Sequence, residues 1–318
     1  MIVVTGANGF VGGALVRRLL LDGHEVRGIA RRGGELPGIP AACLVGIGEF
    51  TPQTNWRTAM AGARVVVHCA ARVHVMRDRA EDPLTAFRRI NVDVTESLAR
   101  AAAAAGVRRM IFLSSIKVNG ESTAPGRPFS ACDQPAPADP YGISKWEAEQ
   151  ALWRISAETG LEVAIIRPPL VYGNGVRANF RMMMRLVGMG IPLPLGAIDN
   201  RRSLVALENL VDLIVTCLDH PAANRGTFLV SDGEDLSTTD LLQRLGGALH
   251  RPTRLVRVPA GWLLALGRLA GRGDLVQRVC GSLQVDLNPT RERLGWHPPL
   301  SVHDALARLA EPMRIERR

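Results

Sequence analysis

A glycine-rich loop joins an apolar strand to a helix near the beginning of the chain, and this junction constrains the fold more than any other feature. Residues 2–5 (IVVT) form a β-branched run, residues 6–12 (GANGFVG) supply the loop, and residues 14–22 carry leucines on one helical face. Glycines here permit a tight turn and let backbone N–H groups approach a pyrophosphate at the helix N-terminus. The spacing is GxxGxxG and not the common GxGxxG, so a plain strand-to-helix turn is the alternative to dinucleotide binding. The expected contacts in the loop are Gly6, Asn8, Gly9, Phe10 and Gly12.

The alternation of strand and helix continues through the first half of the chain. Short apolar runs predict strands at residues 25–30, 42–45, 65–69, 109–113 and 162–167, and helices are expected at 55–61, 82–105 and 141–159. Repeated strand–helix–strand units indicate an α/β fold, namely a doubly wound parallel sheet of the Rossmann type with helices on both faces.

Beyond Pro168 and Pro169 the alternation becomes irregular. Helices are expected at residues 180–189, 209–218, 239–249, 261–270 and 302–310, and short strands at 204–206 and 227–230. We therefore predict a dinucleotide-binding domain over residues 1–167 and a smaller, irregular, mainly substrate-binding lobe over 168–318. About residues 203–230 of that lobe are expected to return to the first domain.

Composition limits the class of protein. The 318 residues include 47% hydrophobic and 22% charged side chains, which is ordinary for a globular protein. The formal net charge is +9 and the pI is near 10.3, but arginines spread along the whole chain without the clusters or interleaved aromatics of a nucleic-acid-binding face. The five cysteines have neither disulfide nor zinc spacing, so we expect no metal site and a reducing, cytoplasmic compartment.

No membrane-spanning segment is expected, and no signal peptide precedes the first strand. The most apolar late stretch, residues 259–270, is too short to cross a bilayer. We expect a core helix there, and the alternative is an amphipathic helix that touches a membrane.

Two arginines follow the second expected strand, where many dinucleotide-binding folds carry an acid that holds the adenosine 2′-hydroxyl. Arg31 and Arg32 can instead pair with a 2′-phosphate, which favours NADP(H), with NAD as the alternative. The plainer interpretation is that they solvate a strand end. Ala70 and Ala71 are small enough to lie beside a cofactor, whereas His68 is expected to be a packed core residue.

A helix opens at residues 139–145 (DPYGISK) with a tyrosine and a lysine four residues apart on one face. Asp139 can cap this helix, and Pro140 suits its first position, where no N–H is needed. An ammonium beside a phenol favours the phenolate, so the pKa of Tyr141 is expected to fall from about 10 toward working pH. Such a tyrosine can exchange a proton with a sugar or alcohol oxygen. The alternative is an incidental pair of Tyr141 and Lys145 on a surface helix.

Ser115 follows the strand at 109–113, at the sheet edge where doubly wound folds bind ligands. The order of glycine loop, Ser115 and YxxxK resembles the extended short-chain dehydrogenase/reductase family, of the NAD-dependent epimerase/dehydratase type. Residues 167–168 (RP), 171–173 (VYG) and 294–296 (LGW) extend the resemblance over nearly the whole chain. One departure is Asn119, which replaces the family's tyrosine in the turn after Ser115.

The resemblance implies a mechanism and a set of binding residues. Tyr141 would exchange a proton with the C4 oxygen of a nucleotide sugar, which the resemblance implies is UDP-linked, and Ser115 would hydrogen-bond the same oxygen. Lys145 would lower the pKa of the tyrosine and hold the nicotinamide ribose, while the nicotinamide carries the hydride. The further contacts implied are Pro168 with the cofactor, and Asn179 and Arg202 with the diphosphate of the substrate.

The residues after Ser115 narrow the reaction. Dehydratases and decarboxylases of the family place an acid there, where this chain has Ile116 and Lys117, so a 4-epimerase or a 4-keto reductase remains. Residues 114–121 (SSIKVNGE) and 72–76 (RVHVM) look like bacterial enzymes of surface-polysaccharide (O-antigen) synthesis. This similarity implies reduction of a UDP-4-keto-6-deoxy-N-acetylhexosamine.

Two alternatives to the reductase remain open. The first is a UDP-hexose or UDP-N-acetylhexosamine 4-epimerase with tightly bound NAD, and the second is a non-catalytic NADP(H)-binding protein. The family resemblance also implies a homodimer, in which the long helices near residues 83–105 and 141–159 pair between subunits.

Overall fold

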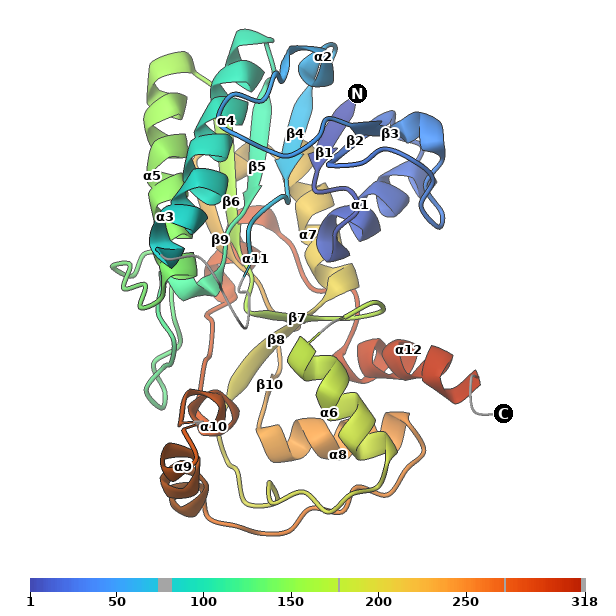
Figure 1. The fold of residues 1–318 in the computed structure, drawn as a ribbon, viewed down its shortest axis with the longest axis vertical. Helices are drawn as coiled ribbons and strands as arrows, with labels where there is room; N and C mark the ends of the chain where they lie inside the picture. The colour runs from blue at the N-terminus through green and yellow to red at the C-terminus, as the bar shows by residue number, and fades with distance from the viewer. Residues whose placement is uncertain (74–81, 177, 272, 316–318) are drawn as a thin grey trace.

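The computed structural model describes residues 1–73, 82–176, 178–271 and 273–315, which form two lobes (Figure 1). The upper lobe in that view contains the N-terminus and the larger sheet, and the lower lobe contains the smaller sheet and the C-terminal helix. None of the helices among these described residues is long and apolar enough to cross a membrane.

The larger sheet has seven strands, and every neighbouring pair in it is parallel. Its strand order is β3-β2-β1-β4-β5-β6-β9. The strands are β1 (Ile2–Thr5), β2 (Val26–Ala30), β3 (Leu44–Gly46), β4 (Val65–His68), β5 (Arg109–Leu113), β6 (Glu162–Arg167) and β9 (Gly226–Leu229). The order reverses direction between β1 and β4, which is the switch point where doubly wound sheets bind ligands. The predicted α/β class and doubly wound sheet are therefore confirmed.

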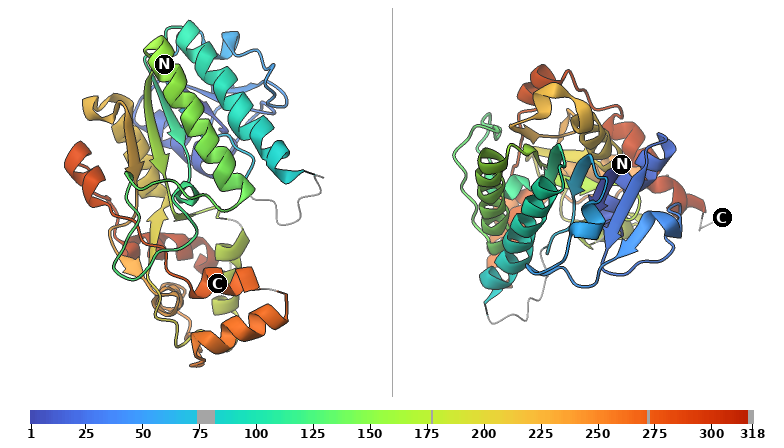
Figure 2. Two further views of the ribbon diagram at one scale, coloured as in Figure 1. Left: turned by 90° about the vertical axis from the view of Figure 1, so that its left-hand side faces the viewer. Right: turned by 90° about the horizontal axis from the view of Figure 1, so that it is seen from above.

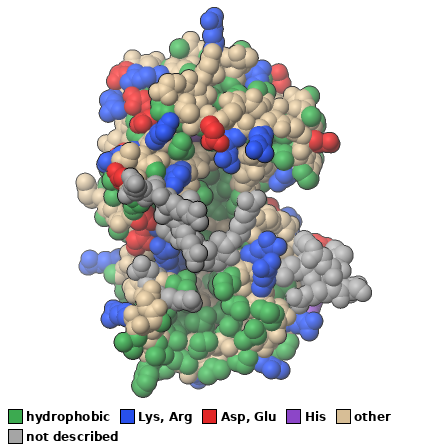
Figure 3. Space-filling view, in the orientation of Figure 1, with side chains coloured by type: hydrophobic (Ala, Val, Ile, Leu, Met, Phe, Trp, Pro, Cys, Tyr) green, Lys and Arg blue, Asp and Glu red, His purple; other side chains and the backbone are tan. Residues whose placement is uncertain are grey.

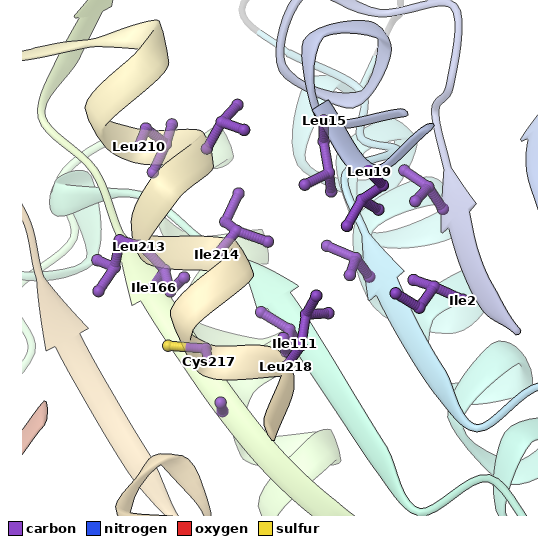
Figure 4. Packing of buried hydrophobic residues seen from close by; sticks show 14 of the residues in the cluster. Ile2, Leu15, Leu19, Ile111, Ile166, Leu210, Leu213, Ile214, Cys217 and Leu218 are labelled. Carbon is purple, nitrogen blue, oxygen red and sulfur yellow. The ribbon is translucent and has the colours of Figure 1, made fainter. Parts of the chain in front are cut away.

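Helices cover both faces of this sheet, as the side view in Figure 2 shows. Helices α1 (Phe10–Leu21) and α7 (Leu207–Asp219) cover one face, and α2 (Arg57–Met60), α4 (Val94–Ala104) and α5 (Pro140–Thr159) cover the other. Side chains alternate along each strand, so Ile2 and Val4 pack with the first set of helices and Val3 with the second. Figure 4 shows the first of these two cores, where leucines of α1 and α7 meet over the strands. The fully buried β-branched runs follow from this double coverage.

The helix expected at residues 82–105 is not uniform. Asp82 caps α3 (Pro83–Arg88) by accepting a hydrogen bond from the Thr85 N–H, and a π-helical segment, η2 (Arg89–Asp93), then leads into α4. The π segment widens one turn, and such turns are frequent near functional sites.

The smaller sheet has the strand order β10-β8-β7. Its strands are β7 (Leu170–Tyr172), β8 (Arg202–Ala206) and β10 (Asp235–Leu236), and the surrounding helices are α6 (Ala178–Gly188), α8 (Thr238–Ala248), α9 (Ala260–Leu269), α10 (Gly273–Cys280) and α12 (Val302–Ile315). Short helical segments complete the chain: η1 (Ala41–Cys43), η3 (Ile116–Val118), η4 (Pro221–Ala223) and α11 (Asn288–Leu294). Within the segment 203–230, β9 joins the larger sheet whereas β8 belongs to the smaller one. The domain limits themselves stay a prediction.

A buried carboxylate ties the two sheets together. Asp232 follows β9 and accepts hydrogen bonds from the Tyr172 hydroxyl (2.6 Å), the Ala206 N–H (2.8 Å) and the Asn209 amide (2.7 Å). Tyr172 ends β7 and Ala206 ends β8. The Asp232 side chain, which follows a strand of the larger sheet, therefore holds the ends of two strands of the smaller sheet.

The expectation of a core helix at residues 259–270 was wrong. Helix α9 forms there, but of its residues, all of which the structure describes, Gly267 alone is buried. The apolar side chains occupy two sides of α9, and α10 packs against this helix.

Candidate active site

The glycine loop between β1 and α1 brings two stretches of backbone unusually close together. Gly6 has a φ of +70°, and a Cβ there would lie 2.8 Å from the Ala70 nitrogen. A Cβ at Gly12 would lie 2.3 Å from the Gly6 carbonyl oxygen. Gly9 is the N-cap of α1 in an extended conformation, and no side chain caps this helix, so its first N–H groups are left for a ligand. A close backbone and an open helix N-terminus fit the phosphates of a dinucleotide.

The other expected loop contacts surround the same junction. Asn8 is exposed, and Phe10 begins α1 with its ring beside Gly175 of the second lobe. Ala71 follows Ala70 at the end of β4, and both are partly exposed. Pro168 accepts a hydrogen bond from the Ile116 N–H through its carbonyl (3.0 Å), which joins the ends of β5 and β6.

Ser115 and Tyr141 come together from distant parts of the chain. Ser115 follows β5 and caps the short helix η3, where its hydroxyl accepts from the Lys117 N–H (3.3 Å). Tyr141 lies in the first turn of α5, which Asp139 caps through the Gly142 N–H (2.7 Å), as the sequence predicts. The side chains of Ser115 and Tyr141 hydrogen-bond each other.

The expected fall in the pKa of Tyr141 is not found. Burial raises the pKa of Tyr141 to about 12, and the hydrogen bond from Ser115 opposes this change while the negative charge of Asp139 adds to it. The ammonium of Lys145, which the sequence expectation placed beside the phenol, lies over the Phe112 ring. An i,i+4 spacing fixes the face of a helix but does not fix where a long side chain ends.

Lys145 is buried, with an exposed fraction of 1%. Its Nζ lies 4.1 Å from the centroid of the Phe112 ring, an arrangement in which the aromatic face stabilises the cation. Burial lowers the pKa of Lys145 to about 7, and the charge of Glu149 opposes this shift. The ammonium therefore changes its charge close to neutral pH.

His68 is a packed core residue, as the sequence predicts. Its Nδ1 lies 2.6 Å from the Thr5 hydroxyl and its Nε2 lies 3.0 Å from the Thr95 hydroxyl. Burial lowers the pKa of His68 to about 3, and the charge of Lys145 contributes. The imidazole is therefore neutral and links β1, β4 and α4.

The carboxylate nearest to Tyr141 in the sequence is already engaged. Asp139 uses one oxygen to cap α5 and the other to pair with the Lys117 ammonium. Lys117 also pairs with Glu121, at 2.8 Å. An elimination needs an acid that is available for proton transfer, and Asp139 does not meet this condition.

A buried polar network that was not predicted from the sequence lies next to the catalytic candidates. Glu149 accepts hydrogen bonds from Arg167 Nε (3.0 Å), Arg167 Nη2 (2.6 Å) and the Ser114 hydroxyl (2.5 Å). Arg167 Nη1 donates to Asn119 Oδ1 (2.9 Å), and the Asn119 amide donates to the Ser130 carbonyl (2.7 Å). Asn119, where the family resemblance expects a tyrosine, thus holds the loop after η3 against β6. One signal was available, because Glu149 stands four residues after Lys145 on the same helical face.

A second missed group fixes the start of α5 from the π segment. The Asn91 amide donates to the Ser144 hydroxyl (2.9 Å), which donates in turn to the Tyr141 carbonyl (2.8 Å). Asn91 Oδ1 also accepts from the Arg72 N–H (2.8 Å). No local pattern marks Asn91, because its role depends on the π turn in η2.

The arginines expected at the 2′-position of the adenosine ribose lie where the sequence puts them. Arg31 and Arg32 are exposed and follow β2 directly. Arg31 lies 3.6 Å from Glu49 in an exposed ion pair, and its carbonyl accepts from the Gly48 N–H (3.1 Å). An exposed pair of this kind is weak and leaves the guanidinium able to take a phosphate.

Of the two expected substrate residues, Arg202 is the one whose side chain the structure describes. The side chain of Asn179 and residues 74–76 lie outside the described part of the chain. Arg202 lies on β8, where its Nη1 donates to the carbonyls of Arg278 (2.7 Å) and Gly281 (3.0 Å). Burial lowers the pKa of Arg202, and the charge of Glu121 opposes this shift.

Comparisons with known proteins bear on the family and the fold of the chain. The model of the NAD dependent epimerase/dehydratase family matches residues 2–230. A UDP-glucose 4-epimerase of Vibrio cholerae is 46% identical over 311 residues, which cover 98% of this chain and 94% of that protein. A Thermotoga maritima UDP-glucose 4-epimerase, solved with UDP-glucose, has a TM-score of 0.76 at 20% identity and covers 100% of this chain and 99% of its own. A Bacillus cereus UDP-glucuronic acid 4-epimerase, solved with NAD, has a TM-score of 0.77 at 20% identity, with 99% and 98% covered. The two likenesses to solved structures show the fold alone.

Proposed function

The chain belongs to the NAD dependent epimerase/dehydratase family, and from this premise we propose that it is a UDP-hexose 4-epimerase. The observation that carries the proposal is the 46% identity to the Vibrio cholerae enzyme over 98% of this chain. The sequence motifs alone favour a 4-keto reductase over a 4-epimerase. This relative favours the 4-epimerase.

The residues around Tyr141 support proton exchange at C4 of the sugar. Tyr141 takes the proton of the C4 hydroxyl and later returns one to the same oxygen, while Ser115 hydrogen-bonds that oxygen. A bound nicotinamide dinucleotide supplies the hydride acceptor and, in its oxidised form, a positive charge. A cation beside the phenol lowers its pKa, which opposes the rise caused by burial. The sugar must turn between the two proton transfers so that C4 presents its other face.

The engaged state of Asp139 supports an epimerase over a dehydratase. A dehydratase of this family needs an acid after the serine, and this chain has Ile116 and Lys117 there. Because Asp139 pairs with Lys117 and caps α5, it does not replace the missing acid. Tyr141, hydrogen-bonded to Ser115, is then the group that exchanges a proton with the C4 oxygen of the sugar.

A 4-keto reductase is the second candidate, and Arg31 and Arg32 favour it. Both are exposed after β2, where guanidinium groups can hold the 2′-phosphate of NADPH. A reductase needs a cofactor that leaves after each turnover, whereas an epimerase keeps its NAD. The family model that matches residues 2–230 is described as NAD dependent, which favours NAD for this chain.

The remaining assignments are proposals by resemblance. Arg202 and Asn179 hold the diphosphate of the substrate, and residues 168–318 supply most of the substrate-binding lobe. Helices α4 and α5 pair between the subunits of a homodimer.

The function is tested by turnover without added cofactor. The purified protein is incubated with UDP-glucose, and UDP-galactose is separated and quantified. We expect interconversion to equilibrium, and NAD released from the denatured protein. Oxidation of added NADPH by a UDP-4-keto sugar, with no interconversion, would instead establish the reductase. Full activity of Tyr141→Phe would contradict the role of Tyr141 in the epimerase reaction and in the reductase reaction alike.

A further inference from the structure

Helix α9 exposes a stripe of large apolar side chains. Trp262, Leu266 and Leu269 are 70%, 57% and 86% exposed, and their spacing places them on one helical face. On the other side of the helix, Leu263 and Gly267 are partly or fully buried, and α9 packs against α10. Helix α9 is therefore apolar on two sides, and one of them faces solvent.

Two further large apolar side chains of the same segment are exposed. Val256 precedes the helix and is 51% exposed, and Leu275 on α10 is 46% exposed. Figure 3 shows hydrophobic side chains gathered over the lower lobe, with Lys and Arg side chains at the margins. Burying such surface is favourable, and contiguous patches of this kind mark interaction sites.

The same segment is strongly basic. Within residues 251–280 the acid is Asp274, and the arginines are Arg251, Arg254, Arg257, Arg268, Arg272 and Arg278. All of these arginines that the structure describes are exposed, and no ion pair among the described residues involves them. An apolar stripe accompanied by exposed guanidinium groups is complementary to a lipid surface, which has an apolar interior and anionic headgroups.

Two other occupants fit less well. In a symmetric contact between two copies of the chain, the arginines around the stripe would face their own counterparts and repel. A pocket for a small apolar ligand would bury its lining, whereas Leu269 is 86% exposed. A protruding helix with this pattern is typical of contact with a lipid surface.

We propose that the described residues 251–271 and 273–280, here called the α9–α10 surface, bind an anionic phospholipid membrane. Trp262, Leu266 and Leu269 insert at the boundary between headgroups and acyl chains, and the exposed arginines contact lipid phosphates. Figure 1 places α9 at the end of the lower lobe that is remote from the larger sheet, so docking leaves α4 and α5 uncovered.

The docked surface connects directly to the substrate lobe. The carbonyls of Arg278 and Gly281 accept from Arg202, and Asn200 donates to the carbonyls of Val279 (3.1 Å) and Gly281 (2.8 Å). These bonds fix the end of α10 to the strand β8 and the loop before it. Membrane contact at α9 therefore positions this lobe against the bilayer.

Vesicle flotation tests the proposal with the full chain. Wild-type protein is mixed with vesicles of phosphatidylcholine alone, or of phosphatidylcholine with phosphatidylglycerol, and floated on a density gradient. We expect flotation with the mixed vesicles only, and loss of flotation as salt is raised. The variants Trp262→Ser/Leu269→Ser and Arg254→Glu/Arg257→Glu are each expected to reduce the bound fraction by roughly tenfold or more.

A matched control separates this surface from exposed leucine in general. Leu21→Ser changes an 85% exposed residue at the end of α1, in the other lobe, and should float like wild type. Epimerase turnover of all three variants should equal that of wild type, so this test is independent of the proposed activity. Equal flotation on phosphatidylcholine alone, or unchanged flotation of both double variants, overturns the proposal. A dimer that becomes a monomer in Trp262→Ser/Leu269→Ser would assign the stripe to a second copy and overturn it as well.

Discussion

Removing Glu149 should destabilise the protein far more than removing a comparable exposed glutamate from the same helix. The exposed fractions of the Glu149 and Arg167 side chains are 0% and 4%, and Glu149 accepts two bonds from Arg167 and one from Ser114. In Glu149→Ala the Arg167 guanidinium stays buried and loses its carboxylate partner, while it keeps the hydrogen bond from its Nη1 to Asn119 Oδ1. An uncompensated buried charge costs about 3–5 kcal/mol. At about 2 °C per kcal/mol, the unfolding midpoint should fall by roughly 6–10 °C.

Glu158→Ala is the matched control. Glu158 also lies on α5 and also pairs with an arginine, Arg100, at 2.9 Å, but the two side chains are 45% and 47% exposed. Exposed pairs contribute about 0–1 kcal/mol, so this midpoint should move by no more than about 2 °C. Thermal unfolding followed by circular dichroism measures both variants. Equal shifts in the two variants would refute the argument from buried charge.

A double change tests the same reasoning from the other side. In Glu149→Leu/Arg167→Met both charges are replaced by apolar side chains, so no charge is left uncompensated. This variant should be more stable than either single variant, because replacing a buried pair is less costly than breaking it. Additive losses from the two single changes would show that charge compensation is not the cause.

The remaining predictions concern the site and its surroundings. Tyr141→Phe should lower kcat by about 10²–10⁴-fold in a UDP-glucose turnover assay, because the C4 hydroxyl then has no phenol with which to exchange its proton. A loss below tenfold would mean that another group exchanges this proton. His68 has a pKa of about 3 in the folded protein and 6.5 when exposed, so the unfolded chain binds the extra proton as pH falls. The contribution of the neutral His68 to the free energy of unfolding is thus fully present above pH 6.5 and is smaller by about 3 kcal/mol at pH 4.5. The free energy of unfolding can be measured with urea above pH 6.5 and at pH 4.5. In His68→Asn it should fall less between these pH values than in the wild type; an equal fall in both proteins would contradict this assignment. Replacing Arg31 and Arg32 by serine should lower the NADPH-to-NADH preference in a binding titration, and no change would mean that these arginines only solvate the strand end.

The sequence predicts the larger sheet well because most of its strands are short, largely buried and mainly apolar runs that alternate with helices. The sequence could not predict the strand order. The reversal between β1 and β4 depends on the face of the sheet against which each connecting helix packs, and no local pattern specifies that face. Strand β7 was missed, since its partner β8 begins thirty residues later and two prolines precede it. Short runs paired over such distances carry no local periodicity.

The catalytic candidates were found for a different reason. Ser115 and Tyr141 belong to motifs whose spacing is visible in the chain, and the structure brings their side chains together. The electrostatics were harder to predict, because the pKa of Tyr141 depends on where the Lys145 ammonium ends. Its position over Phe112 follows from packing against β5 and not from the spacing on α5. Similarly, the exposure of α9 depends on what covers it, and apolar composition alone does not reveal that.

The most direct test of the account is the fate of the hydrogen at C4. UDP-glucose deuterated at C4 is incubated with the purified protein in ordinary water, and the UDP-galactose formed is analysed by mass spectrometry and NMR. If Tyr141 moves only the hydroxyl proton and the C4 hydride leaves and returns within one bound complex, the product keeps its deuterium at C4, and Tyr141→Phe makes almost no product. Loss of the label from C4, or a labelled product formed equally fast by Tyr141→Phe, would contradict the account.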